Sequence, residues 1–215
     1  MTRWITKLSD SFRRRRMQRF ARECGIDAST RVLDIGGTPD CWRLIPVCPR
    51  LVLLNTPRAG EDLAGAASWV AADGRQLPFA DGSFDLVFSN SVIEHVGDSA
   101  SQQQFAREVA RVGQRYWVQT PNRWFPVEQH LLTPLIHWLP RSWQRSLVPR
   151  FNLWSLLVPA TPDRRRFYIE HYLSDVRLLD SGELLALFPG AGIIRERFFG
   201  ITKSLIAVSS PPKSR

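Results

Sequence analysis

Short apolar runs, each closed by a turn signal, recur through the first half of the chain. The runs are Arg31–Ile35, Leu51–Asn55, Ser68–Ala72, Phe84–Ser89 and Arg115–Thr120. Before the last of them, Ser99 to Val112 places apolar residues at helical spacing, with Ser99 in position to cap the helix. Strands separated by crossovers predict a parallel sheet with helices on its faces, and near-continuous apolar strands fit burial in such a sheet. The pattern therefore predicts an α/β fold.

The end of the chain carries a helical segment and two more β-rich runs. Leu173–Phe188 has leucines that supply a core face, so it is expected to form a helix. The runs Ile193–Phe199 and Ser204–Ser209 follow and are joined through Gly200. Their connection is short enough for a hairpin, so the last strand is expected to run antiparallel to its neighbour. We predict a mostly parallel seven-stranded sheet with an antiparallel last strand.

Residues 121 to about 172 interrupt this α/β pattern. The stretch is rich in prolines and basic residues, and its large aromatic residues include Trp124, Phe125, Trp138, Trp143 and Trp154. Such residues form a core more often than a substrate box, and the apolar runs are too short to cross a bilayer. A chain of 215 residues is too short for two full-sized domains. We expect a single domain over 1–215, with a helical, aromatic insertion at 121–172 that serves as a substrate lid.

Basic residues outnumber acidic ones, with 29 Lys and Arg against 20 Asp and Glu. They cluster at Arg13–Arg16 and at Arg164–Arg166. Residues 1–28 are expected to form a basic helix that ends at Gly25, with apolar groups on one side and arginines on the other. The charge favours acidic partners such as nucleic acid or anionic lipid headgroups, although a solvated face would show the same run. We keep open a peripheral contact with an anionic membrane through Arg13–Arg16.

The three cysteines, Cys24, Cys41 and Cys48, have no C-x-x-C spacing, and their odd number argues against a disulfide framework. A reducing compartment is the natural inference. The N-terminal arginines are not followed by the apolar stretch of a signal peptide, and no run is apolar and long enough to span a membrane. We therefore expect a cytoplasmic protein, with peripheral membrane attachment as the alternative.

Two strand ends carry carboxylates beside glycines, which is typical of a ligand site in an open α/β sheet. The first run ends in Asp34-Ile35-Gly36-Gly37, where glycine permits close approach of the backbone to a ligand. The loop is not the dinucleotide fingerprint, because Thr38 and Cys41 stand at its second and third glycine positions. The third run is followed by Asp73-Gly74, and a carboxylate there can accept a hydrogen bond from the exocyclic amine of an adenine.

Three segments, in this order and spacing, resemble the class I methyltransferases of the type 11 group. They read VLDIGG, AADGRQLPFADGSFDLVFSNSVIEHV and RYWVQTPNRWFPVE. The resemblance is specific from about Arg31 to Thr120 and loose for the closing strands. It implies a Rossmann-like three-layer sandwich, S-adenosylmethionine as the cofactor, and methyl transfer as the activity. The cofactor-binding residues that it implies are Asp34, Gly36, Gly37, Asn55, Asp73, Gly74, Asn90 and Ser91.

Two departures from the family pattern concern the cofactor loop and the second strand. Thr38 and Asp40 replace two glycines of the loop, and Asn55 replaces the acid that usually grips the ribose hydroxyls. Loss of one charge-assisted hydrogen bond costs roughly 1.5–3 kcal/mol, or about a tenfold to hundredfold weaker binding. An active enzyme is the favoured interpretation. A cofactor-binding relative without turnover, which acts through a partner, is the alternative.

Candidate bases for methyl transfer follow the fourth and fifth strands. Glu94 and His95 form one pair, and His130 with Glu128 forms the second. Histidine has an ordinary pKa near 6.5, which suits proton acceptance at neutral pH. The Glu-His pair after the fourth strand would equally serve to organise the cofactor loop. Some relatives carry an E-x-x-E-H metal cluster here, but Ser91 stands at its first glutamate, so no metal is expected.

The sequence leaves the methyl acceptor open. The resemblance favours a small hydroxylated molecule, and the basic helix with the Trp-rich insertion suits a lipid-linked acceptor, in both cases methylated at oxygen. An RNA acceptor would suit the net charge of +9. Asn90 to Ile93 reads N-S-V-I rather than the N/D-P-P-Y/F of enzymes that methylate base nitrogens, which makes nucleic acid the weaker choice. A dinucleotide oxidoreductase is disfavoured by the first loop.

Overall fold

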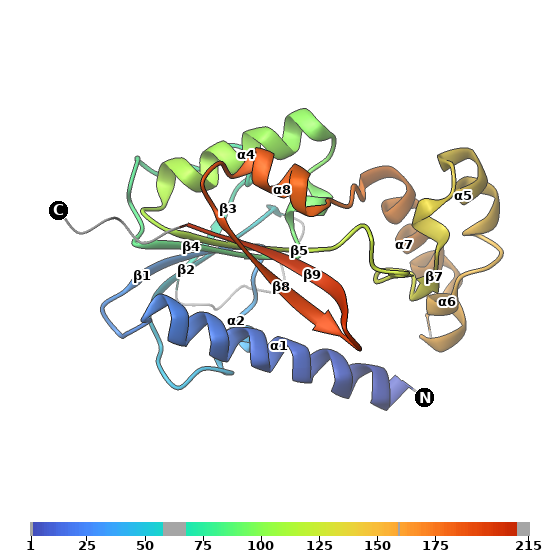
Figure 1. Ribbon diagram of the computed structural model, residues 1–215, viewed down its shortest axis with the longest axis horizontal. Helices are drawn as coiled ribbons and strands as arrows, with labels where there is room; N and C mark the ends of the chain where they lie inside the picture. Colours follow the sequence, from blue (N-terminus) through green and yellow to red (C-terminus); the bar gives the residue numbers. More distant parts are fainter. Residues whose placement is uncertain (1, 58–67, 159, 210–215) are drawn as a thin grey trace.

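A seven-stranded sheet forms the middle layer of the molecule (Figure 1). The computed structural model describes residues 2–57, 68–158 and 160–209, with side chains from Asp10 onward. The strand order is β3-β2-β1-β4-β5-β9-β8. The strands are β1 Arg31–Ile35, β2 Arg50–Asn55, β3 Trp69–Ala71, β4 Leu86–Asn90, β5 Tyr116–Pro121, β8 Gly192–Phe198 and β9 Ile201–Val208. β1 to β5 pair in parallel, and β9 runs antiparallel to both β5 and β8. The predicted sheet is confirmed.

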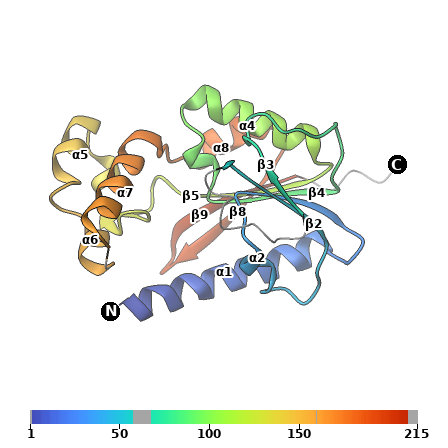
Figure 2. The same cartoon turned by 180° about the vertical axis from the view of Figure 1, so that it is seen from behind.

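Helices cover both faces of the sheet, as Figures 1 and 2 show. On one face lie α1 (Thr2–Cys24) and the short α2 (Pro39–Trp42), and on the other lie α4 (Ser99–Val112) and α8 (Ser181–Leu187). Under α1, Phe20 is fully buried with its ring centroid 4.6 Å from that of Phe88. The predicted end of this helix is confirmed, because Gly25 follows it with a φ of 60°.

Arg16 departs from the predicted arginine face of α1. Its side chain is buried and donates hydrogen bonds to the carboxylate of Glu196 on β8, at 2.8 and 2.6 Å. It also donates to Asn90 on β4 and, at 3.1 Å, to Gln119 on β5. Arg13 to Arg15 remain exposed. The prediction of a membrane contact through all four arginines is therefore wrong for Arg16, which instead joins α1 to the sheet.

Two helix boundaries differ from the sequence predictions. α4 spans the predicted Ser99–Val112, but its cap is Asp98, whose side chain accepts a hydrogen bond from the backbone of Ser101 at 2.9 Å. Leu173–Phe188 is not one helix. Helix α7 (Pro162–Asp175) ends at Asp175, and α8 begins at Ser181. Asp180 and Glu183 form a capping box that starts the second helix. The three-residue spacing of these two acids is a sequence signal for a helix start, but the leucine pattern that runs across it predicted one continuous helix.

The segment between β5 and α8 builds a small helical unit at the end of the sheet where β5 leads out (Figure 1). It contains β6 (Val127–Glu128), β7 (Thr133–Pro134), the 3-10 turn Ile136–Trp138, α5 (Arg141–Leu147), α6 (Leu153–Leu157) and α7. A core of its own holds it together, made of Leu131, Ile136, Val148, Ile169, Tyr172 and Val176. Among the described helices, none has an apolar stretch long enough to cross a membrane.

Candidate functional site

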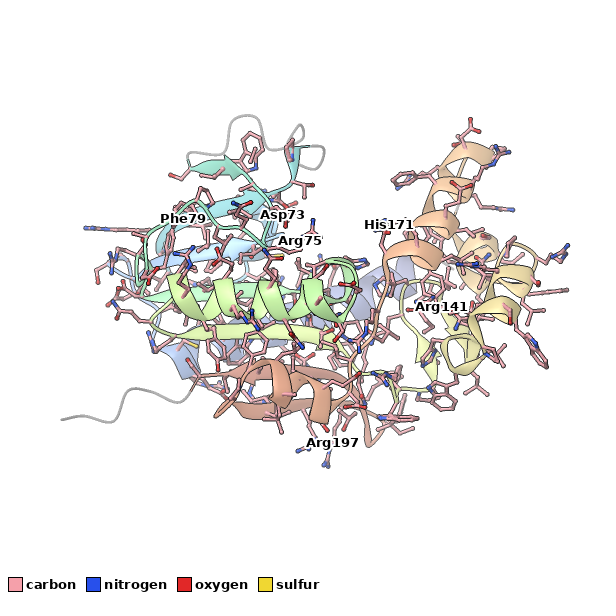
Figure 3. The ribbon with its side chains drawn as sticks, turned by 90° about the horizontal axis from the view of Figure 1, so that it is seen from above. Asp73, Arg75, Phe79, Arg141, His171 and Arg197 are labelled. Carbon is pink, nitrogen blue, oxygen red and sulfur yellow. The ribbon has the colours of Figure 1, made fainter. Side chains whose placement is uncertain are left out.

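A cavity of about 310 Å³ opens at the carboxyl ends of β1, β2 and β3. Its walls come from these strand ends, from the segment after β4, and from α7 of the insertion. In Figure 3, Asp73 and Arg75 lie on one side of this region and His171 of α7 on the other. The position agrees with the general rule that open α/β sheets bind ligands at the carboxyl ends of their strands.

The loop after β1 leaves room for a ligand because two of its residues lack side chains. Gly36 has a φ of 77°, and a Cβ there would overlap the side chain of Val92. A Cβ on Gly37 would overlap the carboxylate of Asp34, which lies beneath the loop. Larger residues are therefore excluded at both positions. Gly36 lines the cavity and Gly37 does not.

Asp34 supports this loop rather than facing the cavity. It is fully buried, and its carboxylate accepts a hydrogen bond from the indole of Trp42 at 2.7 Å. Burial raises the pKa of Asp34 to about 7, and the hydrogen bond from Trp42 opposes the rise. Asp34 is not among the residues of the cavity wall. Contact of Asp34 with the cofactor stays a prediction.

Asn55 explains how the chain accommodates the loss of the usual acid. Its side-chain amide donates a hydrogen bond to the carbonyl of Gly37 at 3.0 Å, which ties β2 to the loop after β1. An acid could not donate this bond. Asn55 also lines the cavity, and its carbonyl oxygen can accept a hydroxyl without carrying charge. Compared with an acid at this position, Asn55 therefore lacks a charged acceptor but forms a hydrogen bond that fixes the loop after β1.

Asp73 lies at the end of β3 and pairs with Arg75. The guanidinium of Arg75 donates to the Asp73 carboxylate at 2.6 Å, and this hydrogen bond lowers the pKa of Asp73. Both residues line the cavity, as does Gly74. A Cβ on Gly74 would lie 2.8 Å from the ring of Phe105, so glycine lets β3 pack closely against α4. Contact of Asp73 with an adenine stays a prediction.

Asn90 and Ser91, at the end of β4, position the next turn and do not line this cavity. Ser91 has a φ of 58°, which is uncommon for a residue other than glycine. Its hydroxyl donates to the side-chain oxygen of Gln119 at 2.9 Å, the same oxygen that accepts from Arg16. These bonds fix the entry to the 3-10 turn Ile93–His95, which carries the first pair of candidate bases.

The structure brings the two predicted pairs of candidate bases together. The Nε2 atoms of His95 and His130 lie 3.1 Å apart. His130 Nδ1 lies 2.6 Å from Glu128 Oε1, and the other Glu128 oxygen accepts from the backbone of Leu131 at 2.6 Å. Glu128 is buried, so both of its oxygens are held in place. When Nδ1–H donates to this carboxylate, the lone pair of His130 lies on Nε2, which faces the Nε2 of His95 and is the atom that can take a proton.

Their surroundings shift the pKa values of the two histidines in opposite directions. Burial favours the neutral form of His130, but the hydrogen bond and charge of Glu128 outweigh it and raise the pKa of His130. Burial, followed by the charges of His130 and His171, lowers the pKa of His95 to about 4. His130 therefore accepts a proton before His95 does, and His95 stays neutral at physiological pH.

Glu94, from the same 3-10 turn as His95, lies next to the histidine pair. It is fully buried, and Thr120 on β5 donates to its Oε2 at 3.0 Å. Its Oε1 has no partner among the described residues, and burial raises the pKa of Glu94 to about 7. Ligand atoms of Glu94, His95 and His130 all lie within 4.8 Å of one another, so the three could hold a metal ion. Ser91 commits its hydroxyl to Gln119 and adds no fourth ligand, and the expectation of no metal stays a prediction.

His171 is a site residue that the sequence did not reveal. Its ring stacks on that of His95, with centroids 5.4 Å apart and an angle of 8° between the planes. It lines the cavity from α7 and pairs with Asp175 at 2.6 Å. No local motif distinguishes it. Arg16 was also missed, although Phe12, Arg16 and Phe20 at four-residue spacing would have placed it on the buried side of α1.

Comparison with known proteins supports the resemblance to a methyltransferase family. The model of the methyltransferase domain family, Methyltransf_11, matches residues 12–115, which span α1 to α4 and most of the cavity wall. Just under half of the chain is thus similar to the methyltransferase domain family, in agreement with the resemblance seen in the sequence. That resemblance implies S-adenosylmethionine as the cofactor. The glycine cradle of Gly36 and the lining residues Asn55, Asp73 and Gly74 fit such a group, and we expect them to hold it.

Curated and structural relatives agree with this family. The methyltransferase is 28% identical over 172 residues to the chloroplastic tocopherol O-methyltransferase of Arabidopsis thaliana, an overlap of 77% of this chain and 46% of that protein. The chain thus spans less than half the length of the curated relatives it matches. Among solved structures, one from Rhodobacter sphaeroides, named for Zn-dependent alcohol dehydrogenases, aligns with a TM-score of 0.57 at 14% identity, over 86% of this chain and 85% of that one. A methyltransferase in complex with the Haloferax volcanii activator Trm112 aligns with a TM-score of 0.53 at 14% identity, over 88% and 85% of the two chains. These structures support the fold alone.

Proposed function

We propose that this methyltransferase transfers a methyl group to an oxygen atom of a small-molecule or lipid-linked acceptor, with His130 as the general base. S-adenosylmethionine supplies an electrophilic methyl group, and its sulfonium sulfur leaves as a neutral thioether. The acceptor oxygen forms a bond to the methyl carbon as the carbon–sulfur bond breaks, and the hydroxyl proton moves to His130 Nε2. The observation that carries the proposal is the Glu128–His130 pair, whose Nε2 lies 3.1 Å from His95.

Glu128 gives His130 two advantages over His95 as a base. It holds the proton of His130 on Nδ1, and its charge stabilises the imidazolium that forms. His95, with a pKa of about 4, is a weak base in these surroundings. It lines the cofactor cavity and stacks on His171, so we assign it the role of orienting His130 and the cofactor.

Transfer to oxygen rests on chemistry and on one relative. A hydroxyl needs a base to become a good nucleophile, and a positioned base contributes roughly 10²–10⁴-fold to rate. The Arabidopsis relative is an O-methyltransferase by name, and the alignment covers 77% of this chain. A degenerate cofactor-binding protein and an RNA methyltransferase remain as outcomes of the test.

We also propose that the protein works in the cytoplasm at an anionic membrane surface, through the insertion and Arg13 to Arg15. Large apolar side chains of the insertion are exposed, with Phe151 at 68%, Leu156 at 79% and Phe167 at 66% of their accessible area. Arg164 to Arg166 are exposed beside the last of them. Apolar side chains next to arginines suit an interface of headgroups and acyl chains.

The test begins with calorimetric titration of S-adenosylmethionine and S-adenosylhomocysteine into wild type and Asp73→Ala. Micromolar binding that weakens about tenfold or more in Asp73→Ala is expected. A screen of hydroxylated acceptors with labelled methyl groups follows, with His130→Gln in parallel. Methylation that is lost in His130→Gln while cofactor affinity is kept supports the proposal. Cofactor binding with no methylated hydroxyl, or methylation of RNA alone, would overturn it.

A further inference from the structure

A second cavity, of about 430 Å³, opens on the other side of His130. It is formed where α1, the segment after β5, the β8–β9 hairpin and the insertion meet. The residues that matter most for its chemistry are Phe12, Phe125, Trp154, Tyr168, Phe198 and Lys203. Four separate parts of the chain therefore contribute to one cavity beside the proposed base.

The histidine pair contributes one side chain to the wall of each cavity. His95 lines the cofactor cavity, and His130 lines the second cavity. Their Nε2 atoms lie 3.1 Å apart. A methyl donor in the first space and a nucleophile in the second would thus approach each other beside the proposed base. In-line methyl transfer needs the donor and the acceptor to face each other beside such a base.

The walls of the second cavity favour a flat ring. Trp154 and Tyr168 stack with centroids 4.1 Å apart and planes 11° from parallel. The hydroxyl of Tyr168 donates to the backbone carbonyl of His130 at 2.9 Å, so this wall is fixed to the base. In the same wall, Phe12 and Phe125 each meet Phe198 edge to face. Aromatic walls with fixed orientation bind aromatic ligands by stacking and edge contacts.

Lys203 places one positive charge in this apolar space. Its Nζ lies 4.4 Å from the centroid of the Phe12 ring, and among the described residues it forms no ion pair. Glu196, an acid on the neighbouring strand, is committed to Arg16. Burial lowers the pKa of Lys203, and the charge of Arg16 lowers it further. A half-buried ammonium without a carboxylate partner is stabilised by an anionic ligand.

We propose that this cavity binds the methyl acceptor and that the acceptor is a hydroxylated aromatic acid. The ring lies between the aromatic walls, the acidic group faces Lys203, and a ring hydroxyl faces His130. The proposal rests on the proposed methyl transfer for the role of the hydroxyl. Recognition of the ring and of the acid rests on the cavity itself and can be measured without turnover.

The experiment is calorimetric titration of 3,4-dihydroxybenzoate and of uncharged catechol into the protein saturated with S-adenosylhomocysteine. We expect the acid to bind about tenfold to a hundredfold more tightly than catechol, as a charge-assisted contact provides. Lys203→Met should remove this difference and leave catechol affinity unchanged, and Lys203→Arg should keep it. Arg197→Met is the matched control, because Arg197 is an exposed cation of the same hairpin that points away from the molecule in Figure 3.

The outcomes separate this inference from the proposed function. Equal binding of acid and catechol, no binding of either, or an unchanged preference in Lys203→Met would overturn the assignment of the cavity. Lys203-dependent binding without methyl transfer would uphold the cavity and overturn the proposed reaction. Methylation of a hydroxylated acceptor whose binding does not depend on Lys203 would uphold the reaction and overturn the aromatic acid.

Discussion

The sheet region, residues 31–121, and the insertion, residues 122–175, use apolar side chains in different ways. Eight of the large apolar side chains that are exposed in the described structure lie in the insertion, and none lies in the described part of 31–121. They are Trp124, Leu135, Trp138, Trp143, Phe151, Leu153, Leu156 and Phe167. The sheet region buries its large apolar residues in two cores, whereas the insertion has a small core and an apolar surface. The sheet region therefore stabilises the fold, and the insertion is suited to contact other molecules.

The pair of His95 and His130 lies at the boundary between these two regions. His95 follows β4 of the sheet, and His130 follows β6 of the insertion. His171 of the insertion stacks on His95 and lines the cofactor cavity. Cofactor binding is thus expected to depend on the sheet, and chemistry on the insertion. Six predictions test this division.

The largest effect is expected from Glu128→Gln in the insertion. Loss of the charge that stabilises the His130 imidazolium should lower kcat by roughly a hundredfold to a thousandfold, with cofactor affinity unchanged. Steady-state kinetics and calorimetry measure the two quantities. Glu170→Gln is the matched control, since Glu170 is an exposed carboxylate of α7. A loss of cofactor affinity equal to the loss of kcat would contradict the division.

The same variant has a defined pH dependence. His130 must be neutral to accept a proton, so wild-type kcat/KM should rise with pH through a His130 pKa that Glu128 holds above its ordinary value. Without the Glu128 charge, burial dominates and lowers that pKa, although Glu94 still opposes the change. The rising limb of Glu128→Gln should therefore lie at lower pH than that of wild type. An unmoved limb would assign the base to another group.

Arg16→Met should destabilise the protein by about 3 kcal/mol, because it leaves Glu196 in a largely buried position without its partner. Urea unfolding measures this loss. Arg14→Met on the exposed side of the same helix should change stability by less than about 0.5 kcal/mol. Equal effects of the two variants would show that α1 is not joined to the sheet through Arg16.

Gly37→Ala should weaken cofactor binding by about tenfold or more, because the new methyl group would displace the Asp34 carboxylate beneath the loop. Overpacking of this kind costs about 1–3 kcal/mol. Gly182→Ala is the control, since a Cβ there meets Asp180 at an ordinary 3.4 Å at the start of α8. Cofactor affinity that survives Gly37→Ala would place the binding loop elsewhere.

A smaller effect is expected for membrane contact. The double variant Leu156→Ser, Phe167→Ser should reduce co-sedimentation with anionic phosphatidylglycerol vesicles by about fivefold, and high salt should reduce it in wild type. Phe199→Ser is the control, because Phe199 is 91% exposed but lies on the β8–β9 hairpin outside the insertion. Absence of vesicle binding by wild type at every salt concentration would remove the membrane from the proposal.

No effect is expected from metal removal. Glu94, His95 and His130 are the three described residues close enough to share an ion, and no further described residue joins them as a ligand. Dialysis against a chelator should leave the methylation rate unchanged. A rate that falls and returns on addition of Mg²⁺, Mn²⁺ or Zn²⁺ would show that the cluster is a metal site.

Local features of the fold were predictable because they depend on neighbouring residues. The period of Ser99–Val112 predicted α4 over its full length, and the Gly-Gly turn after Arg31–Ile35 predicted the end of β1. The single helix expected over Leu173–Phe188 failed because a capping box at Asp180 competes with the leucine period. Four of the eight predicted cofactor residues, Gly36, Asn55, Asp73 and Gly74, line the cavity. The other four, Asp34, Gly37, Asn90 and Ser91, are not part of its wall.

By itself, the sequence determined the strands of the main sheet, the helices α1 and α4, the glycine turns and the family resemblance, because propensity, periodicity and motif spacing act over a few residues at a time. Only the tertiary structure decided that His130 meets His95, that His171 covers the cofactor cavity, and that Lys203 shares a space with Phe12. It also decided that Arg16 is buried while its neighbours Arg13 to Arg15 are exposed. These contacts join residues from 35 to 191 positions apart (130 − 95 and 203 − 12). They depend on how the sheet, the hairpin and the insertion pack together, which no local pattern encodes.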